Sequence, residues 1–231
     1  SFGAYSFEDQ QQKIYQTNID GTIKLINILK NHNIHSFIHA GSSSEYGLNS
    51  NAPIEEMACI PDSDYSISKL AASNYINLVG KKHGFPGVSL RLYSVYGPLE
   101  DSSRLMPNLI KEGLKKSYPR FVNKNISRDF IYVQDVCNAF VMAALKMNPS
   151  IYGEIFNIGS GKKTTIENLA YVAKNTFDII EDPKFGSLEN RKWDLSNWFS
   201  NPSKAKDMLG WEAKTSIQTG LNKTVEWTKD F

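Results

Sequence analysis

The chain has 231 residues, of which 41% are hydrophobic and 22% charged, and its formal net charge is +2. These values are typical of a globular protein with one large domain or two small ones, and they give no argument for nucleic acid or a membrane surface as the main partner. No apolar run approaches the ~20 residues that span a bilayer, and no signal segment opens the chain. We therefore expect a cytoplasmic protein in which Cys59 and Cys137 are reduced thiols.

The first half of the chain alternates between helical and strand patterns. Apolar residues three or four apart are typical of a helix face, and short apolar runs that end in turn residues are typical of buried strands. On this basis we expect a helix over 7–30, a strand over 34–40, a polar loop over 41–51, a helix over 64–82 whose apolar stripe is Ile67, Leu70, Ala71, Tyr75 and Leu78, and a strand over 88–95.

The second half continues the alternation with shorter elements. Its patterns predict a helix over 105–116, short strands within 121–133, a helix over 134–147, a strand over 155–158, a helix over 165–177, a loop-rich segment over 178–201, and helices over 203–209 and 217–229. Strands that alternate with helices indicate an α/β fold with a mostly parallel sheet. Ligands of such sheets bind beyond the carboxyl ends of the strands, so we expect the site in the loops after Ala40 and Leu92.

Tyr65 and Lys69 stand four residues apart at the start of the helix expected over 64–82, and therefore on one face of it. An ammonium beside a phenol favours the phenolate, which predicts that the pKa of Tyr65 is lowered from its usual ~10 towards neutrality. Such a tyrosine can accept or donate a proton during hydride transfer. The spacing alone is weak evidence, because a chain with 11 tyrosines and this many lysines is expected to contain such a pair by chance. A packed core aromatic is the structural alternative.

Two further motifs flank this pair. Gly41-Ser42-Ser43-Ser44-Glu45-Tyr46-Gly47 follows the first predicted strand, and Arg91-Leu92-Tyr93-Ser94-Val95-Tyr96-Gly97-Pro98 ends the second. With them the chain resembles the extended short-chain dehydrogenase/reductase family, in its nucleotide-sugar epimerase and dehydratase branch. Further matches in the family's order are Asn18-Ile19-Asp20-Gly21-Thr22, Arg128-Asp129-Phe130-Ile131-Tyr132-Val133-Gln134-Asp135-Val136, Phe156-Asn157-Ile158-Gly159, Ser203-Lys204-Ala205 and Leu209-Gly210-Trp211.

The resemblance implies catalytic roles for four residues. Tyr65 is the acid/base that moves the proton of a sugar hydroxyl, Lys69 lowers its pKa and holds the nicotinamide ribose, and Ser43 hydrogen-bonds the same hydroxyl or the ketone that it becomes. In similar dehydratases a glutamate two residues beyond that serine removes a proton beside the ketone, which implies Glu45. This chain has one residue fewer between the glutamate and the following tyrosine, so the hydrogen-bonding serine is either Ser42 or Ser43. Tyr65, Lys69 and Ser42 are the implied contacts to NAD.

A sugar diphosphate carries two phosphates, which arginine side chains match well, and only five arginines are present. The substrate contacts that the resemblance implies are Ser43, Tyr93, Ser94, Arg104, Arg128, Asn157 and Arg191. The structural alternatives are loop polarity for the serines, a solvated Glu45, an ion pair of Arg128 with an acid such as Asp135, and an exposed Arg191. His39 is expected to be a satisfied core histidine, and no cluster has metal-ligand spacing.

The family binds NAD through a glycine-rich loop after its first strand and an acidic residue further on. Neither precedes the motifs above, so we expect a fragment: 1–98 a remnant of the Rossmann domain, 99–231 mainly a substrate-binding region, and about 131–158 returning to the sheet. The expected fold class is α/β, a truncated Rossmann-like parallel sheet with a smaller C-terminal substrate-binding α/β region. We expect the intact enzyme to use NAD, and the chain as given to bind it weakly or not at all.

Together these features predict an NAD-dependent nucleotide-sugar epimerase or dehydratase that works through a transient ketosugar, with Glu45 slightly favouring a dehydratase. The resemblance implies a role in supplying sugars for surface polysaccharide or lipopolysaccharide. The alternatives are an NADPH-dependent ketosugar reductase and a non-catalytic dinucleotide-sensing or scaffold protein. The family's dimer interface implies a homodimer through the helices over 7–30 and 64–82, with no nucleic acid and no membrane as partner.

Overall fold

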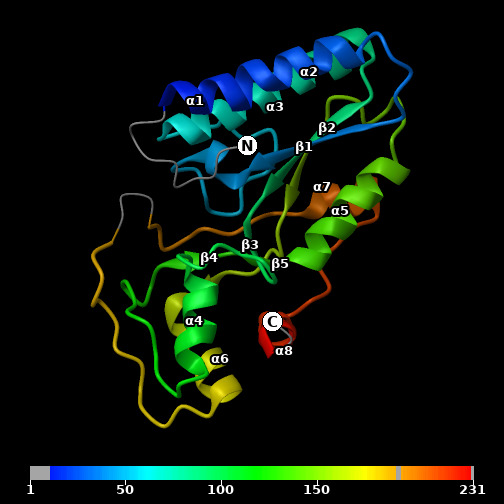
Figure 1. The fold of residues 1–231 in the computed structure, drawn as a ribbon. Coiled ribbons are helices and arrows are strands. Elements are labelled where there is room, and N and C mark those ends of the chain that lie inside the picture. The colour runs from blue at the N-terminus through cyan, green and yellow to red at the C-terminus, as the bar shows by residue number, and fades with distance from the viewer. Residues whose placement is uncertain (1–10, 191–193, 230–231) are drawn as a thin grey trace.

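The computed structural model describes residues 11–190 and 194–229 (Figure 1). Residues 7–10 of the expected first helix lie outside this part of the chain. The elements are, in order, α1 (Gln11–Tyr15), η2 (Gln16–Asp20), α2 (Gly21–Leu29), β1 (Phe37–Ser42), η3 (Ser43–Tyr46), α3 (Asp64–His83), β2 (Gly87–Leu92), β3 (Ser94–Tyr96), α4 (Leu105–Gly113), β4 (Ser127–Arg128), β5 (Phe130–Tyr132), α5 (Val133–Leu145), β6 (Ile155–Ile158), β7 (Thr164–Thr165), α6 (Ile166–Phe177), α7 (Ser203–Leu209) and α8 (Ile217–Lys229).

The main sheet has the order β1-β2-β6, and all three strands are parallel, as the alternation of strands and helices predicts. Ala40 of β1 lies opposite Leu90 of β2, which in turn lies opposite Phe156 of β6. Side chains of β2 alternate between the faces: Leu90 joins the apolar cluster that includes α5, whereas Ser89 Oγ lies 2.9 Å from Ser73 Oγ of α3. Helices α3 and α5 therefore cover opposite faces of the sheet (Figure 1).

Helix α3 does not bury the stripe that its sequence predicts. The helix begins after Ser63, whose hydroxyl accepts a hydrogen bond from the first turn, and ends at Gly84, which takes φ +65°. Ile67 and Leu78 of the predicted stripe are 43% and 50% exposed, while small polar side chains such as Ser73 are buried. The prediction was wrong because the sheet face below this helix is itself polar, so hydroxyl groups pair with it where aliphatic groups cannot.

Strand β1 starts and ends later than predicted, so that Gly41 and Ser42 continue the strand and do not open a loop. A Cβ on Gly41 would lie 2.8 Å from both Glu45 Oε1 and Ser89 Oγ, so only glycine lets the strand pass these groups at this distance. The chain then turns through η3, which brings the rest of the serine-rich motif back against the sheet.

A second core lies away from the main sheet, where α4, α6 and α8 pack together (Figure 1). Leu109 of α4, Leu169 of α6 and Leu221 of α8 are fully buried in it, and so is Phe121 from the segment between α4 and β4. Two small sheets join this core to the main sheet: β3 pairs with β5 in parallel, and β4 pairs with β7 antiparallel. The expected division of the chain at residue 98 stays a prediction.

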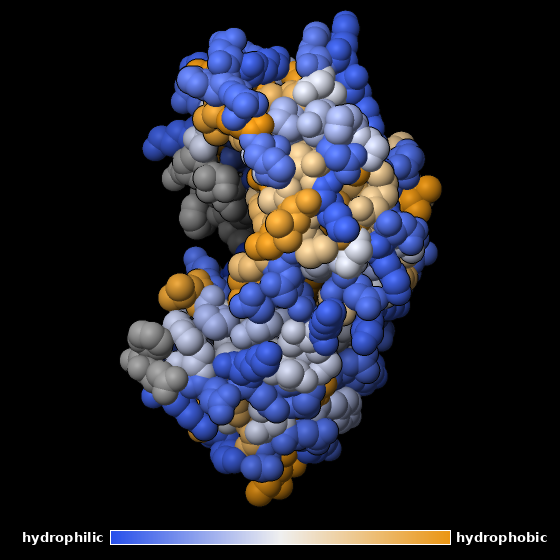
Figure 2. All heavy atoms as spheres, turned by 90° about the vertical axis from the view of Figure 1, so that its right-hand side faces the viewer, coloured by the Kyte–Doolittle hydropathy of each residue, from blue (hydrophilic) through white to orange (hydrophobic). Residues whose placement is uncertain are grey.

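The outer surface of α5 is apolar. Figure 2 shows apolar side chains gathered on this side of the molecule, where Val141 and Leu145 of α5 are exposed. Among the described residues, no helix is both long and apolar enough to span a bilayer.

Candidate active site

Tyr65, Lys69 and Ser42 meet where β1 ends and α3 begins. Lys69 Nζ lies 5.7 Å from the centroid of the Tyr65 ring and donates a hydrogen bond of 3.0 Å to the carbonyl oxygen of Ala40. Tyr65 shares a hydrogen bond with Ser42, the last residue of β1. The three groups that the resemblance assigns to NAD and to proton transfer are therefore brought together by the strand end and the first turns of one helix.

The expected lowering of the Tyr65 pKa is not found. Burial raises the pKa of Tyr65, and the negative charge of Glu45 raises it further, while the hydrogen bond with Ser42 and the charge of Arg104 oppose the rise. Lys69 is itself buried, which lowers its own pKa, and its ammonium is directed to the Ala40 carbonyl. Helical spacing places the two side chains on one face, but burial outweighs the attraction between ammonium and phenolate.

Ser43 bonds to the late loop. Its Oγ accepts a hydrogen bond of 3.3 Å from Trp198 Nε1 of the late loop, because the chain leaves β1 at this residue and enters η3. Ser42 is the serine that bonds Tyr65, and which of the two serines hydrogen-bonds the sugar hydroxyl stays open. The expected contact of Ser43 with the sugar hydroxyl or ketone stays a prediction.

Glu45 is fully buried, and both of its oxygens are engaged. Arg91 Nε donates to Oε2 at 2.7 Å, while Ser73 Oγ and the Ser42 amide donate to Oε1 at 3.0 and 2.9 Å. A general base has to reach the proton that it removes, and this carboxylate is paired with Arg91 below the turn. The geometry thus argues against the expected base, and Glu45 caps η3 and neutralises a buried guanidinium.

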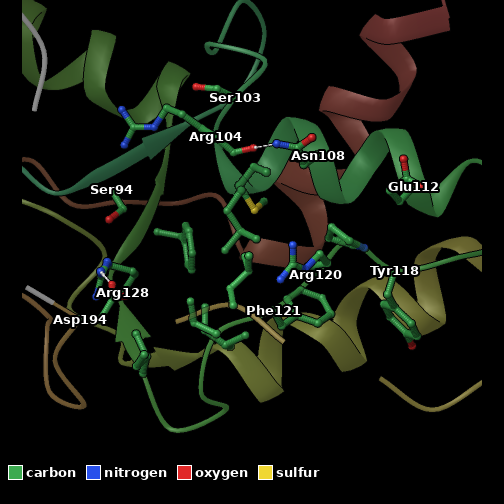
Figure 3. A pocket seen from close by; sticks show the side chains of 18 of the residues that line it. Ser94, Ser103, Arg104, Asn108, Glu112, Tyr118, Arg120, Phe121, Arg128 and Asp194 are labelled. Atoms are coloured by element: carbon green, nitrogen blue, oxygen red, sulfur yellow. Dashed lines mark hydrogen bonds and ion pairs between the residues drawn. The ribbon is translucent and has the colours of Figure 1, made fainter. Parts of the chain in front are cut away.

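A pocket of about 810 Å³ lies between α4, the segment before β4 and the late loop (Figure 3). Three of the five arginines line it, and Figure 3 shows Arg120 reaching towards its centre and Arg128 facing Asp194. The floor is apolar, with Met106 and Phe121 among its side chains. Cationic groups over an apolar floor suit a ligand that carries both phosphates and a flat ring.

The predicted substrate residues on the pocket wall are Ser94, Arg104 and Arg128. Arg128 donates to Asp194 at 2.5 Å, and not to Asp135, which was the acid named in the structural alternative. Asp135 instead accepts hydrogen bonds from the backbone at 214 and 215. Arg104 pairs with Glu100 at 3.1 Å, and the positive charge of Arg104 acts to lower the pKa of Tyr65. The pocket therefore extends to the neighbourhood of the candidate acid/base.

Asn157 and Tyr93 do not line this pocket. Asn157 is fully buried: its amide oxygen accepts from Tyr46 Oη at 2.8 Å, and its amide nitrogen donates to the Pro53 carbonyl at 2.8 Å. The expected substrate contact of Asn157 is corrected, because this amide already ties β6 to the loop after η3. Tyr93 is buried as well, and its hydroxyl has no hydrogen-bond partner among the described residues. Arg191 lies outside the described residues.

A smaller cavity of about 240 Å³ lies on the other side of Lys69, against η2 and α2. Asn18 lines it; its Nδ2 donates to Ser68 Oγ at 3.0 Å, and its buried Oδ1 has no partner in the part of the chain that the structure describes. His39 lines it too, and burial lowers the pKa of His39 to about 3, so this imidazole is neutral. An unpaired amide oxygen beside a lysine fits the hydroxyl groups of a ribose.

Three residues that line these two cavities escaped the sequence reasoning, Arg120, Glu100 and Asn18, as did Trp198, whose ring lies against Arg128. The scarcity of arginine could have singled out Arg120, and Asn18 stands in a motif that was noted without a role. No local sequence pattern indicated Trp198, because its contacts are with Ser43 and Arg128, which lie 155 and 70 positions away in the chain. Within residues 11–190 and 194–229, no group of His, Cys, Asp and Glu could hold a metal ion.

Comparison with known proteins adds independent findings. The family described as the NAD dependent epimerase/dehydratase family matches residues 3–159. A putative UDP-glucose 4-epimerase of Methanocaldococcus jannaschii is 30% identical over 92% of this chain and 69% of its own length. A trifunctional dehydratase, epimerase and reductase for UDP-linked sugars of Arabidopsis thaliana is 28% identical, and this chain spans only 34% of its length.

Two solved structures share the fold closely. A UDP-N-acetylglucosamine 4-epimerase from Methanobrevibacter ruminantium, in complex with UDP-N-acetylmuramic acid, is 27% identical with a TM-score of 0.87; the match covers 99% of this chain and 74% of that one. A UDP-glucuronic acid 4-epimerase from Bacillus cereus, in complex with UDP-glucuronic acid and NAD, is 28% identical with a TM-score of 0.84; the match covers 97% of this chain and 71% of that one.

Proposed function

Since the chain belongs to the NAD-dependent epimerase/dehydratase family, we propose that it epimerises a nucleotide-diphosphate sugar, with Tyr65 as the acid/base that acts on a sugar hydroxyl. The observation that carries the proposal is the meeting of Tyr65, Lys69 and Ser42 at the strand end, together with Arg104 of the arginine-lined pocket, whose charge acts on Tyr65. An acid/base group, a cation and a phosphate-binding pocket are the parts that a reaction through a transient ketosugar requires.

NAD, when bound, supplies a hydride acceptor that later returns the hydride. The cavity beside Lys69 supports a place for its ribose, because the unpaired Asn18 Oδ1 can accept from one hydroxyl and Lys69 Nζ can donate to another. This chain's residues handle the proton. In its phenolate form Tyr65 takes the proton from the sugar hydroxyl, and as the phenol it gives the proton back; the hydrogen bond with Ser42 favours the phenolate by opposing the rise in pKa that burial causes.

Epimerisation is favoured over dehydration by the position of Glu45. A dehydratase needs a second base to remove a proton next to the ketone. The glutamate expected in that role is buried and bonded to Arg91, whereas epimerisation can proceed with Tyr65 as its one acid/base. The slight preference for a dehydratase that the sequence suggested is therefore withdrawn.

The substrate class follows from the pocket. Arg120 and Arg128 can hold a diphosphate, and the apolar floor that includes Phe121 can take a nucleobase. The two solved relatives are in complex with UDP-linked sugars, which supports a uridine nucleotide as the first candidate. A role in supplying surface polysaccharide and a cytoplasmic location stay predictions.

The test is turnover of UDP-glucose by the full-length protein with NAD supplied, followed by chromatography of the sugar nucleotides. Tyr65→Phe removes the transferable proton and should lower kcat by about 10²- to 10⁴-fold while UDP still binds. Tyr171→Phe removes an exposed hydroxyl of α6 and should leave turnover unchanged. Normal turnover by Tyr65→Phe would refute the assignment, and a dehydrated product would refute the choice of epimerisation.

We also propose a homodimer through the face that α2 and α3 share. Leu25 and Ile28 of α2 are 47% and 59% exposed, and Ile67 and Leu78 of α3 are 43% and 50% exposed. The two helices lie side by side (Figure 1). Contiguous apolar side chains on two neighbouring helices are typical of an interface between copies. The part of the expected interface over 7–10 lies outside the described residues. Light scattering should report a dimer, and Ile28→Asp should give a monomer.

A further inference from the structure

Trp198 links the arginine pocket to the serine-rich turn. Its indole N–H donates to Ser43 Oγ at 3.3 Å, and the guanidinium carbon of Arg128 lies 5.3 Å from the centroid of its ring. Arg128 in turn donates to Asp194 at 2.5 Å on the pocket wall (Figure 3). A single side chain therefore contacts a pocket arginine with its ring face and the residue after Ser42 with its ring edge.

The backbone around Trp198 is held on both sides. Its amide donates to Ser127 Oγ at 3.1 Å, in the strand that carries Arg128. The next residue, Phe199, exchanges backbone hydrogen bonds with the segment 50–52, which follows η3. Because the backbone is fixed at both ends, a change in the position of Arg128 acts on the indole ring itself and not on the loop.

We propose that Trp198 is a positioning residue that couples occupation of the arginine pocket to the serine-rich turn over Ser42–Ser44. The proposal rests on the proposed function, since the ligand that occupies the pocket is a nucleotide diphosphate. A diphosphate competes with Asp194 for the guanidinium of Arg128, and this changes the cation that lies against the indole. The indole N–H transmits the change to Ser43, the neighbour of the serine that bonds Tyr65.

The coupling predicts a spectroscopic signal that a merely structural tryptophan would not produce. UDP is titrated into the purified protein, and tryptophan emission and calorimetric heat are recorded in parallel. In the wild type, emission should change with the same Kd as the heat. Trp198→Phe keeps an aromatic ring against Arg128 but loses the N–H, so calorimetric affinity should stay within about threefold while the emission change is lost.

Trp211→Phe is the matched control. Trp211 also donates its indole N–H, to the Asp135 carbonyl at 2.9 Å, but it lies in the core under α5 and α7. The emission change on adding UDP should persist in this variant. An emission change that survives Trp198→Phe overturns the coupling, as does UDP heat without any emission change in the wild type. Absence of UDP heat overturns the proposed function, and the coupling with it.

Turnover gives a second, independent readout. Trp198→Phe and Ser43→Ala each remove one side of the same hydrogen bond, so each should lower kcat about fivefold with KM within about twofold. The double variant should lose no more than either single variant, because the bond can be removed only once. Multiplicative losses in the double variant, or an unchanged kcat in Trp198→Phe, would show that Trp198 does not act through Ser43.

Discussion

Replacing Glu45 by glutamine separates its structural role from a catalytic one. Glu45 and Arg91 are 0% and 2% exposed and lie 2.7 Å apart, so the substitution leaves a buried guanidinium without its counter-charge. Removing one partner of a buried ion pair costs about 3–5 kcal/mol. We therefore expect the free energy of unfolding of Glu45→Gln to fall by about 3–5 kcal/mol, which for a chain of this length lowers Tm by roughly 10 °C.

The assay is urea unfolding followed by circular dichroism, combined with turnover per folded molecule. Glu56→Gln is the matched control, because Glu56 pairs with Lys204 at the surface and its loss should cost about 0–1 kcal/mol. Glu45→Met with Arg91→Met removes both charges together and should recover most of the lost stability. If Glu45→Gln were as stable as the wild type but turned over about 10²-fold or more slowly, Glu45 would act as a catalytic base and not as the counter-charge of Arg91.

Three further outcomes are expected. Ser42→Ala should lower kcat more than Ser43→Ala does, because only Ser42 bonds Tyr65; equal effects in steady-state kinetics would contradict this. Burial raises the pKa of Glu100 to about 7 from 4.5, so the folded state binds this proton more tightly than the unfolded state does. The free energy of unfolding should therefore fall as the pH rises from 4.5 to 7, and Glu100→Gln, unfolded at pH values from 4 to 8, should not show this fall. Gly41→Ala places a Cβ 2.8 Å from two polar oxygens and should destabilise the protein by about 1–3 kcal/mol in the same unfolding assay, whereas the exposed Gly186→Ala tests only the strain of positive φ.

Much of the fold was predictable from local patterns. The strand over 155–158 and the helices over 203–209 and 217–229 have the predicted bounds, because apolar runs and turn residues within a few positions define them. The buried face of α3 was not predictable in this way. Ser73 packs there because Ser89 of β2 and Glu45 of η3 hydrogen-bond with it, and these contacts join residues 16 and 28 positions apart.

The same distinction between local patterns and long-range contacts applies to the candidate site. Sequence by itself determined the family, the helix that carries Tyr65 and Lys69, and the strand ends at which they act, since each is encoded in a short contiguous motif. Only the tertiary structure decided that Ser42 and not Ser43 bonds Tyr65, that Glu45 neutralises Arg91, and that burial raises the pKa of Tyr65. The physical reason is that pKa values, hydrogen-bond partners and access to a ligand depend on which distant groups share a low-dielectric space, and local spacing carries no record of them.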